Sequence, residues 1–290
     1  MIEDLAHFYA RYSTLVDQIG INALLALSLS VCLRAGQLAL AQAAFMGIAG
    51  YLSAIAVVDG HWPLVLAGPA AIAASTIVGA LLALPVERLR GVFLAIATIG
   101  FGEIVRVVAD NLAITGGAEG FTGIPPVLST PWIYAALAIV GAIVFAARRS
   151  RFALAIQTTR EDEAAAQGVG IDTGMVRVAT LACAGAIAGL AGVLYAFTNF
   201  FITPADFAFG RMEQILVYCV IGGVTSPLGA VVGAALMTVL PEIFRFLHDY
   251  REIVDGLVLL VVIIFAPAGL AGLWRGLKPR ERRPAAALPQ

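Results

Sequence analysis

Two ionisable side chains, Glu103 and Arg106, lie inside a long apolar segment of the sequence. Their spacing of three residues places both on one face of a helix, where opposite charges can pair. Charged groups are costly inside a bilayer and commonly have a function there. The two groups could contact the carboxylate and ammonium of a zwitterionic substrate, or they could form an internal ion pair that locks the fold. Of the two, we favour the ion pair.

A polar stretch, Thr159–Ile171, carries a second group of charges, with the acidic run Glu161–Glu163 near its start. A threonine at position 158 or 159 could cap a helix that holds these acids in its first turn. The alanines at Ala164–Ala166 favour helix, and Gly168 suits the helix end. We therefore expect one short, exposed helix, which is either a docking site for another protein or a solvated connector.

Other polar residues and glycines mark three further places. Gln37 and Gln42 interrupt an apolar run and could line a cavity, satisfy unwound backbone or form a plain hydrogen bond between helices. Thr225 and Ser226 lie at a Gly/Pro-rich break and could line the same cavity. The glycine-rich loop Thr115–Pro126 could be a docking surface for an external protein or only a connector.

Several classes of function are excluded by the residues present. The single lysine, Lys278, precedes Pro279, so the chain lacks the P-loop Lys-Ser or Lys-Thr pair that binds ATP. The three histidines are isolated and the three cysteines lie apart in apolar runs, so we expect no metal site. No intramembrane HExxH, Ser–His or paired-Asp pattern is present, so we expect no catalytic residues. A net charge of −1 without a basic face argues against nucleic-acid binding.

The composition indicates a membrane protein, with 60% hydrophobic residues, 13% charged residues and a mean hydropathy of +0.93. Its apolar runs are continuous rather than alternating, which excludes a barrel. We expect an all-α, polytopic helix bundle of about eight transmembrane segments, at least one of them broken or re-entrant, in a single domain over residues 1–273. The predicted segments are Leu15–Leu33, Leu38–Val58, Pro63–Pro85, Val92–Val108, Trp132–Ala147, Val178–Phe197, the broken segment Met212–Ile243, and Ile253–Leu273.

The arginines orient this bundle, because basic loops stay in the cytoplasm. The basic segments are Arg34, Arg88–Arg90, the longest loop 148–177 and the tail 274–290. This pattern places the N-terminus outside and the C-terminus in the cytoplasm if Met212–Ile243 crosses twice or re-enters. We expect the basic tail to be disordered near anionic headgroups. The first twelve residues lack the apolar core of a signal peptide, so we expect no cleaved leader.

Four stretches resemble, in order, the motifs of one transporter family. They are GQLALAQAAFMG at 36–47, LRGVFLAIATIGFGEIVR at 89–106, TGGAEGFTGIP at 115–125 and YREIVDGL at 250–257. In addition, Glu163-Ala164-Ala165 followed by Gly168 resembles the EAA loop of ABC-transporter membrane subunits, which docks into a groove on the ATPase. The family is the LivM-type permeases of branched-chain amino-acid ABC importers, with Ala41 at a position where that family usually has glycine.

The resemblance implies a permease subunit of an ABC importer for Leu, Ile or Val in the bacterial inner membrane. It implies four kinds of partner: a homologous permease in a heterodimer, two ATPase subunits that bind ATP and Mg, a periplasmic binding protein, and the lipid bilayer. No cofactor is expected in this chain itself. Two alternatives stay open, namely the same family with urea, amide or aromatic-acid cargo, and an ion-coupled secondary transporter that works alone.

Three sets of site residues follow from these expectations. The ATPase-coupling residues are Arg160, Glu161, Glu163, Ala164, Ala165, Gly168 and Ile171. The substrate-path residues are Gln37, Gln42, Thr98, Phe101, Glu103, Arg106, Thr225 and Ser226. The residues for docking of the binding protein are Gly117, Glu119 and Gly120.

Overall fold

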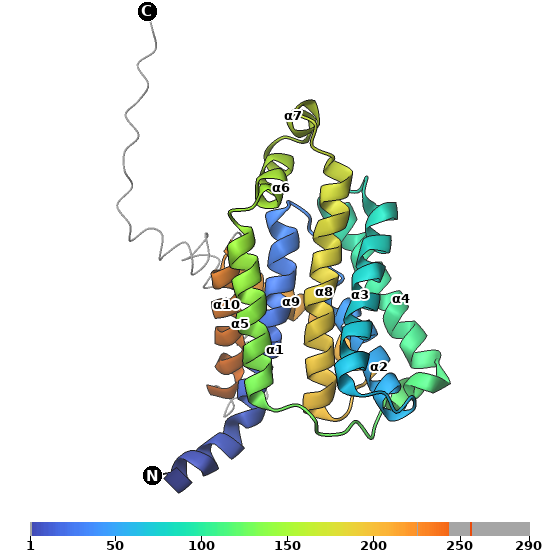
Figure 1. The fold of residues 1–290 in the computed structure, drawn as a ribbon, viewed down its shortest axis with the longest axis vertical. Helices are drawn as coiled ribbons and strands as arrows, with labels where there is room; N and C mark the ends of the chain where they lie inside the picture. The colour runs from blue at the N-terminus through green and yellow to red at the C-terminus, as the bar shows by residue number, and fades with distance from the viewer. Residues whose placement is uncertain (1, 225, 244–255, 257–290) are drawn as a thin grey trace, which may run out of the picture.

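A computed structural model describes residues 2–224 and 226–243 together with the single residue 256. This part of the chain is a bundle of α-helices with three short 3-10 turns and one isolated bridge, between Phe121 and Ile202 (Figure 1). The longer helices are α1 (Ile2–Arg34), α2 (Gln42–Val58), α3 (Leu64–Val86), α4 (Val92–Asn111), α5 (Thr130–Ala147), α6 (Arg151–Glu161), α7 (Glu163–Gly168), α8 (Thr173–Asn199), α9 (Phe209–Gly222) and α10 (Pro227–Ile243). The 3-10 turns are η1 (Ala113–Thr115), η2 (Gly117–Glu119) and η3 (Pro204–Phe207). The predicted segment Ile253–Leu273, apart from Gly256, and the tail 274–290 lie outside the described residues.

Five of the described helices are long and apolar enough to cross a membrane, namely α1 from Ser13 onward, α3, α4, α5 and α8. They confirm five of the predicted segments, and the shorter apolar helix α2 falls within a sixth. Helices α9 and α10 form a pair bent by 119°, which confirms the predicted break inside Met212–Ile243. Together these helices make the chain an all-α, multi-pass membrane protein.

One predicted boundary is wrong. The sequence predicts the second segment from Leu38, but α2 begins only at Gln42. Gly36 has a φ of +73°, a conformation that ends α1 and that glycine adopts without strain. Residues 37–41 then run without helical structure before α2 starts. Apolar side chains alone do not distinguish such an extended stretch from the first turn of a helix.

Helix α8 lies at the centre of the bundle between α1 and α3 (Figure 1), and its glycines allow close contact with its neighbours. A Cβ atom at Gly185 would lie 2.7 Å from the carbonyl oxygen of Ser75 in α3, and one at Gly192 would overlap the backbone of Met46 in α2. The Ser75 hydroxyl lies 2.9 Å from the Gly185 carbonyl oxygen and 3.1 Å from that of Phe45. Gly185 and Gly192 thus allow α8 to pack closely against α3 and α2.

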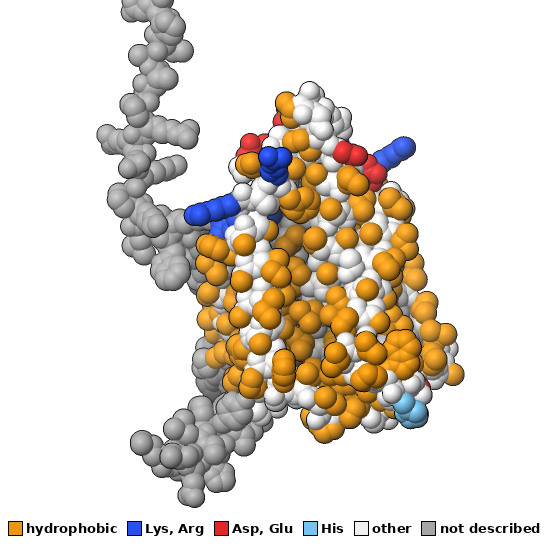
Figure 2. All heavy atoms as spheres, viewed as in Figure 1, with side chains coloured by type: hydrophobic (Ala, Val, Ile, Leu, Met, Phe, Trp, Pro, Cys, Tyr) orange, Lys and Arg blue, Asp and Glu red, His pale blue; other side chains and the backbone are white. Residues whose placement is uncertain are grey.

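The charged side chains are unevenly distributed over the bundle. On the face seen in Figure 2, apolar side chains cover the middle, while Lys, Arg, Asp and Glu gather at the end formed by α6 and α7. Helices α4 and α5 leave large apolar side chains exposed, such as Phe93, Ile104, Ile139 and Ile143. An apolar belt with charges collected at an end is the surface expected of a bundle surrounded by lipid.

Candidate functional site

The predicted loop helix is in fact two helices, and its predicted cap is wrong. Asp162 has extended dihedral angles (φ −153°, ψ 109°) and separates α6 from α7. Its Oδ1 accepts a hydrogen bond from the amide of Ala165 at 3.0 Å, so Asp162 is the N-cap of α7. Thr159 lies inside α6 and is buried. Helix α7 ends at Gly168, as predicted, and the left-handed residue beyond it is Gly170, with a φ of +82°.

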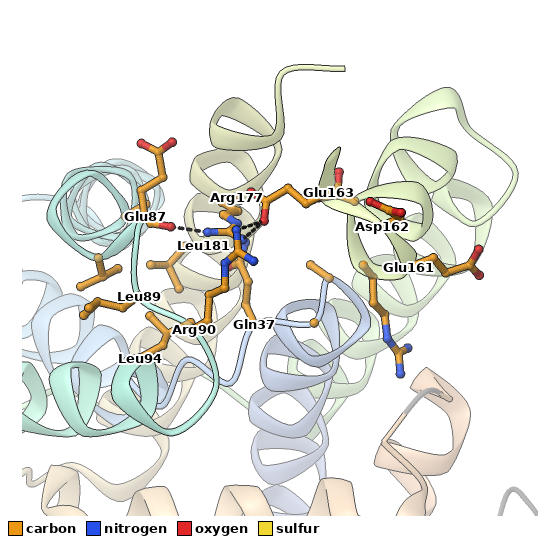
Figure 3. A pocket seen from close by; sticks show the side chains of 16 residues that line it. Gln37, Glu87, Leu89, Arg90, Leu94, Glu161, Asp162, Glu163, Arg177 and Leu181 are labelled. Carbon is orange, nitrogen blue, oxygen red and sulfur yellow. Dashed lines mark hydrogen bonds and ion pairs between the residues drawn. The ribbon is translucent and has the colours of Figure 1, made fainter. Parts of the chain in front are cut away.

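The carboxylate of Glu163, the first residue of α7, points into the protein. Its Oε2 accepts a hydrogen bond from Nη2 of Arg177 at 2.9 Å and also pairs with Arg90. Arg177 donates a further hydrogen bond to the backbone carbonyl of Glu87 (Figure 3). The side chains of Glu163 and Arg177 are only 18% and 17% exposed. This cluster, called the Glu163 anchor below, ties α7 to the start of α8 and to the turn between α3 and α4.

Apart from Gln167, the rest of α7 presents small side chains to the surface. Ala164, Ala165 and Gly168 are exposed, whereas Ala166 is fully buried against the protein. Val169 follows directly and is 74% exposed. Figure 1 shows α7 at the extreme end of the bundle, beyond the ends of the long helices. The loop therefore projects a small, apolar tip whose base is held by ionic contacts.

The other predicted coupling residues lie beside this tip. Arg160 and Glu161 are exposed at the end of α6, and Glu161 accepts a hydrogen bond from Gln157 Nε2 at 3.1 Å. Ile171 is half-buried where the chain leaves α7 for α8. The structure therefore places the predicted coupling residues together at one end of the bundle. Arg90 and Arg177, which orient Glu163, were not predicted, since no local pattern links them to it.

A cavity of about 380 Å³ lies beneath the Glu163 anchor, between the end of α1, the α3–α4 turn and the α6–α7 loop. Gln37 lines it from the extended stretch before α2, and Thr159 lines it from α6. Both side chains are more than nine-tenths buried. Neither Gln37 Nε2 nor Thr159 Oγ1 has a hydrogen-bond partner. Gln37 thus lines a cavity at the α7 end of the bundle, and its predicted role on the substrate path stays a prediction.

Glu103 and Arg106 form the predicted ion pair on α4, and Asp110 is a third charged residue in contact with Arg106. Arg106 Nε lies 2.8 Å from Glu103 Oε2, and Arg106 Nη1 lies 2.9 Å from Asp110 Oδ2. Sequence reasoning missed Asp110, although its i, i+4 spacing from Arg106 was a signal. The three side chains are 30–39% exposed. Nothing lies within 4 Å of a Cβ built at Gly100 or Gly102, so these glycines do not pack against another described helix.

The remaining predicted path residues are packed inside the bundle. Thr98 is fully buried, and its hydroxyl accepts a hydrogen bond from the amide of Leu40 at 2.8 Å, which satisfies the unwound backbone before α2. Phe101 contacts the ring of Phe45, with 6.2 Å between centroids. Gln42 is fully buried and leaves Oε1 without a partner.

The break between α9 and α10 is only partly described. Ser226 accepts a hydrogen bond from the amide of Gly229 at 3.2 Å, as a cap of α10 does. Thr225 lies outside the described residues. The predicted role of the two residues in lining a cavity stays a prediction.

The predicted docking loop lies at the opposite end of the bundle from α7, in the connection from α4 to α5 (Figure 1). Glu119 is exposed, and Gly117 and Gly120 both have positive φ. A Cβ at Gly120 would meet the Ile202 carbonyl at 2.5 Å, next to the Phe121–Ile202 bridge. The loop is thus a fixed surface feature built on left-handed glycines.

A family model described as the permease component of the branched-chain amino acid transport system matches residues 12–267. The chain belongs to this permease family. It is 32% identical, over 252 residues, to the high-affinity branched-chain amino acid transport system permease protein LivM of Salmonella typhimurium and to that of Escherichia coli K12. Each match covers 74% of this chain and 58% of the relative. The autoinducer 2 import system permease protein LsrC of Yersinia pseudotuberculosis is 27% identical over 188 residues, 59% of this chain and 53% of LsrC.

The permease therefore spans less than two thirds of the length of the LivM relatives that it matches. No solved structure gives a significant match to it. The matched range contains the Glu163 anchor, the α4 charges and the loop at Gly117–Gly120. Family membership thus covers the described bundle, including all three predicted sites.

Sequence reasoning missed a cluster of polar and aromatic residues. It lies at the end of α8 that is farthest from α7. The ring of Phe207 lies 5.7 Å from that of Tyr51 and 6.1 Å from that of Tyr195. The guanidinium of Arg211 lies 5.7 Å from the centroid of Tyr195. The Tyr51 hydroxyl and two Arg211 nitrogens are buried without a hydrogen-bond partner. Only the fold brings these residues together, because they come from α2, α8, η3 and α9.

Proposed function

We propose that this chain is a permease subunit of an ABC importer and forms part of the translocation path for Leu, Ile or Val. The observation that carries the proposal is the family match along residues 12–267. The match to the LivM permeases, which is longer and closer than the match to LsrC, supports branched-chain amino acids as cargo. The chain would act as a transport subunit and not as an enzyme.

The energy would come from other subunits. Because the sequence has no P-loop, ATP and Mg²⁺ would bind to two separate ATPase subunits. The small, exposed surface of Ala164, Ala165 and Gly168 would enter a groove on one of them. The buried carboxylate of Glu163 would hold α7 in place from within, and the exposed Arg160 and Glu161 would flank the contact.

The Glu163 anchor would pass the movement of α7 to the bundle. Displacing α7 pulls on Arg177, at the start of α8, and on Arg90, before α4. The middle of α8 is packed through its glycines against α2 and α3, so a movement of the whole helix would displace those helices as well. This is a physical route by which ATPase closure would tilt the helices and alternate access to the path.

The charged face of α4 would meet a second permease subunit. Glu103, Arg106 and Asp110 would be costly if they faced lipid, and they are a third or so exposed in the described chain. The open space beside Gly100 and Gly102 leaves room for another helix. A heterodimer with a homologous permease would cover this face, and the path would run along the junction.

The remaining partners follow from the orientation. The α6–α7 end would face the cytoplasm, as would the C-terminus, and the loop at Gly117–Gly120 would face outward in the bacterial inner membrane. A periplasmic binding protein would dock at that loop and deliver the cargo. The same architecture would serve urea, amide or aromatic-acid cargo. An ion-coupled transporter working alone would have no need for the anchored α7 tip.

Affinity purification of the tagged chain from native membranes, followed by mass spectrometry, tests the proposal. We expect a second polytopic subunit and P-loop ATPases to co-purify. A Glu163→Arg variant should still insert into the membrane but lose the ATPases, whereas Gln157→Arg, on the exposed side of α6, should retain them. Recovery of the chain alone, still able to transport after reconstitution, would favour the ion-coupled alternative.

A further inference from the structure

The cavity beneath the Glu163 anchor has two walls of different chemistry. Its volume of about 380 Å³ is near the lower end of the range for small-molecule sites. One wall is ionic and holds Arg90, Arg177 and Glu163 in contact with one another. The other charged residues that line the cavity are Glu87, Arg160, Glu161 and Asp162. The other wall is aliphatic. Its residues are Ala83, Val86, Leu89, Leu94 and Leu181.

Two buried polar atoms at this cavity lack partners. Gln37 is 7% exposed and Thr159 is 8% exposed, and neither Gln37 Nε2 nor Thr159 Oγ1 makes a hydrogen bond. Most buried polar atoms in proteins are satisfied, and an unsatisfied one is costly. Figure 3 shows the Gln37 side chain directed toward the guanidinium groups of Arg90 and Arg177. An unpaired donor beside two cations is suited to bind an anionic group.

The two arginines of the Glu163 anchor keep N–H donors that its contacts do not use. Two guanidinium groups share one oxygen of one carboxylate, Glu163 Oε2. Each guanidinium has five N–H donors, and the contacts with Glu163 and with the Glu87 carbonyl use only some of them. A carboxylate is the group that Arg binds in a matching planar geometry. The second oxygen of Glu163 takes no part in these contacts and can accept from an ammonium group.

We infer that this cavity is a binding site for a free α-amino acid with an aliphatic side chain. The carboxylate of the ligand contacts Arg90, Arg177 and the Gln37 amide, and its ammonium contacts Glu163. The aliphatic side chain packs against the leucines of the opposite wall, and Thr159 provides a further hydrogen bond. The inference rests on the proposed function for the choice of leucine, isoleucine or valine as the ligand.

A ligand bound in this cavity would affect transport because of where the cavity lies. It lies at the α7 end of the bundle, which faces the cytoplasm in the proposed orientation, so its occupant is imported product. The ligand and α7 share Glu163, Arg90 and Arg177. A bound amino acid therefore holds the anchor in its present arrangement and opposes the movement of α7. Accumulated product should slow further uptake.

The experiment measures binding of radiolabelled leucine to the full complex in lipid nanodiscs, prepared without the binding protein. We expect saturable binding, which the variants below assign to the cavity. Thr159→Val keeps the shape of the side chain and should weaken binding about fivefold, the effect of losing one hydrogen bond. Ala83→Leu fills the cavity and should abolish binding. Ala73→Leu, on the exposed face of the same helix, is the matched control and should bind as the unmodified complex does.

Uptake assays separate this inference from the proposed function. If the complex imports leucine but binds none in the nanodisc assay, the site is refuted and the importer stands. If leucine binding is unchanged by both Thr159→Val and Ala83→Leu, the ligand lies elsewhere and the site is refuted. Binding of inorganic phosphate in place of leucine would also refute it. If the complex imports another class of cargo while the cavity still binds leucine, the proposed cargo is wrong and the site stands.

Discussion

Replacing Glu163 with alanine removes the carboxylate that joins α7 to Arg90 and Arg177. The Arg90 side chain is 71% exposed, so its contact is screened and contributes about 1 kcal/mol or less. The Arg177 contact lies between side chains less than a fifth exposed, and a hydrogen bond between charged groups contributes about 1.5–3 kcal/mol. We expect α7 to lose about 2 kcal/mol of local stability, mainly through Arg177.

Hydrogen exchange of the α7 amides measures this loss directly, because local opening is governed by local stability. A change of about 2 kcal/mol corresponds to about thirtyfold faster exchange. Glu161→Ala is the matched control, since Glu161 is an exposed acid in the same loop that accepts a hydrogen bond from Gln157. Arg177→Ala and the double variant complete a thermodynamic cycle, in which the two losses should not add.

The opposite result would identify a different role for Glu163. If Glu163→Ala and Glu161→Ala exchange at the same rate, the carboxylate does not hold α7. If Glu163→Ala then still loses the ATPases, the carboxylate contacts the ATPase directly, as the resemblance to the EAA loop first suggests. The anchor described here would be refuted.

Three further predictions concern the bundle. Gly192→Ala should lower the free energy of unfolding in detergent by about 1–3 kcal/mol, because the new methyl overlaps the α2 backbone. The control Gly141→Ala should cause no loss, because Gly141 faces open space. Glu103→Arg and Arg106→Glu should each reduce transport, and the double swap should restore part of it if the pair is structural; an inactive double variant would support direct contact with cargo. Asp162→Ala should cost α7 about 1 kcal/mol and speed exchange of the amide that it caps, while unchanged exchange would show that the cap does not stabilise α7.

The membrane segments were predictable because length and hydropathy determine them. The five long spans and the bend between α9 and α10 follow from continuous apolar runs and from a Gly/Pro-rich break. The start of α2 could not be predicted from hydropathy, because the residues just before Gln42 are apolar whether they are helical or extended. The signal that was available was Gly36, whose left-handed φ redirects the chain.

Only those features of the site that depend on neighbouring residues in the sequence were predictable. The position of α7 followed from the acidic and alanine-rich sequence, but its cap did not, because Asp162 and the preceding threonines are all good N-cap residues. The inward direction of the Glu163 carboxylate depends on Arg177 and Arg90, which are 14 and 73 positions away in the chain. Contacts at such separations come from packing of the helices, and a single sequence does not contain them.

The most direct test of the central claim is uptake of radiolabelled leucine by the purified complex in proteoliposomes, with ATP supplied at the α7 side of the membrane. The account predicts uptake that requires ATP, the ATPase subunits and the binding protein, and that persists when ion gradients are collapsed. Leucine uptake by this chain alone, driven by an ion gradient without ATP, would contradict it.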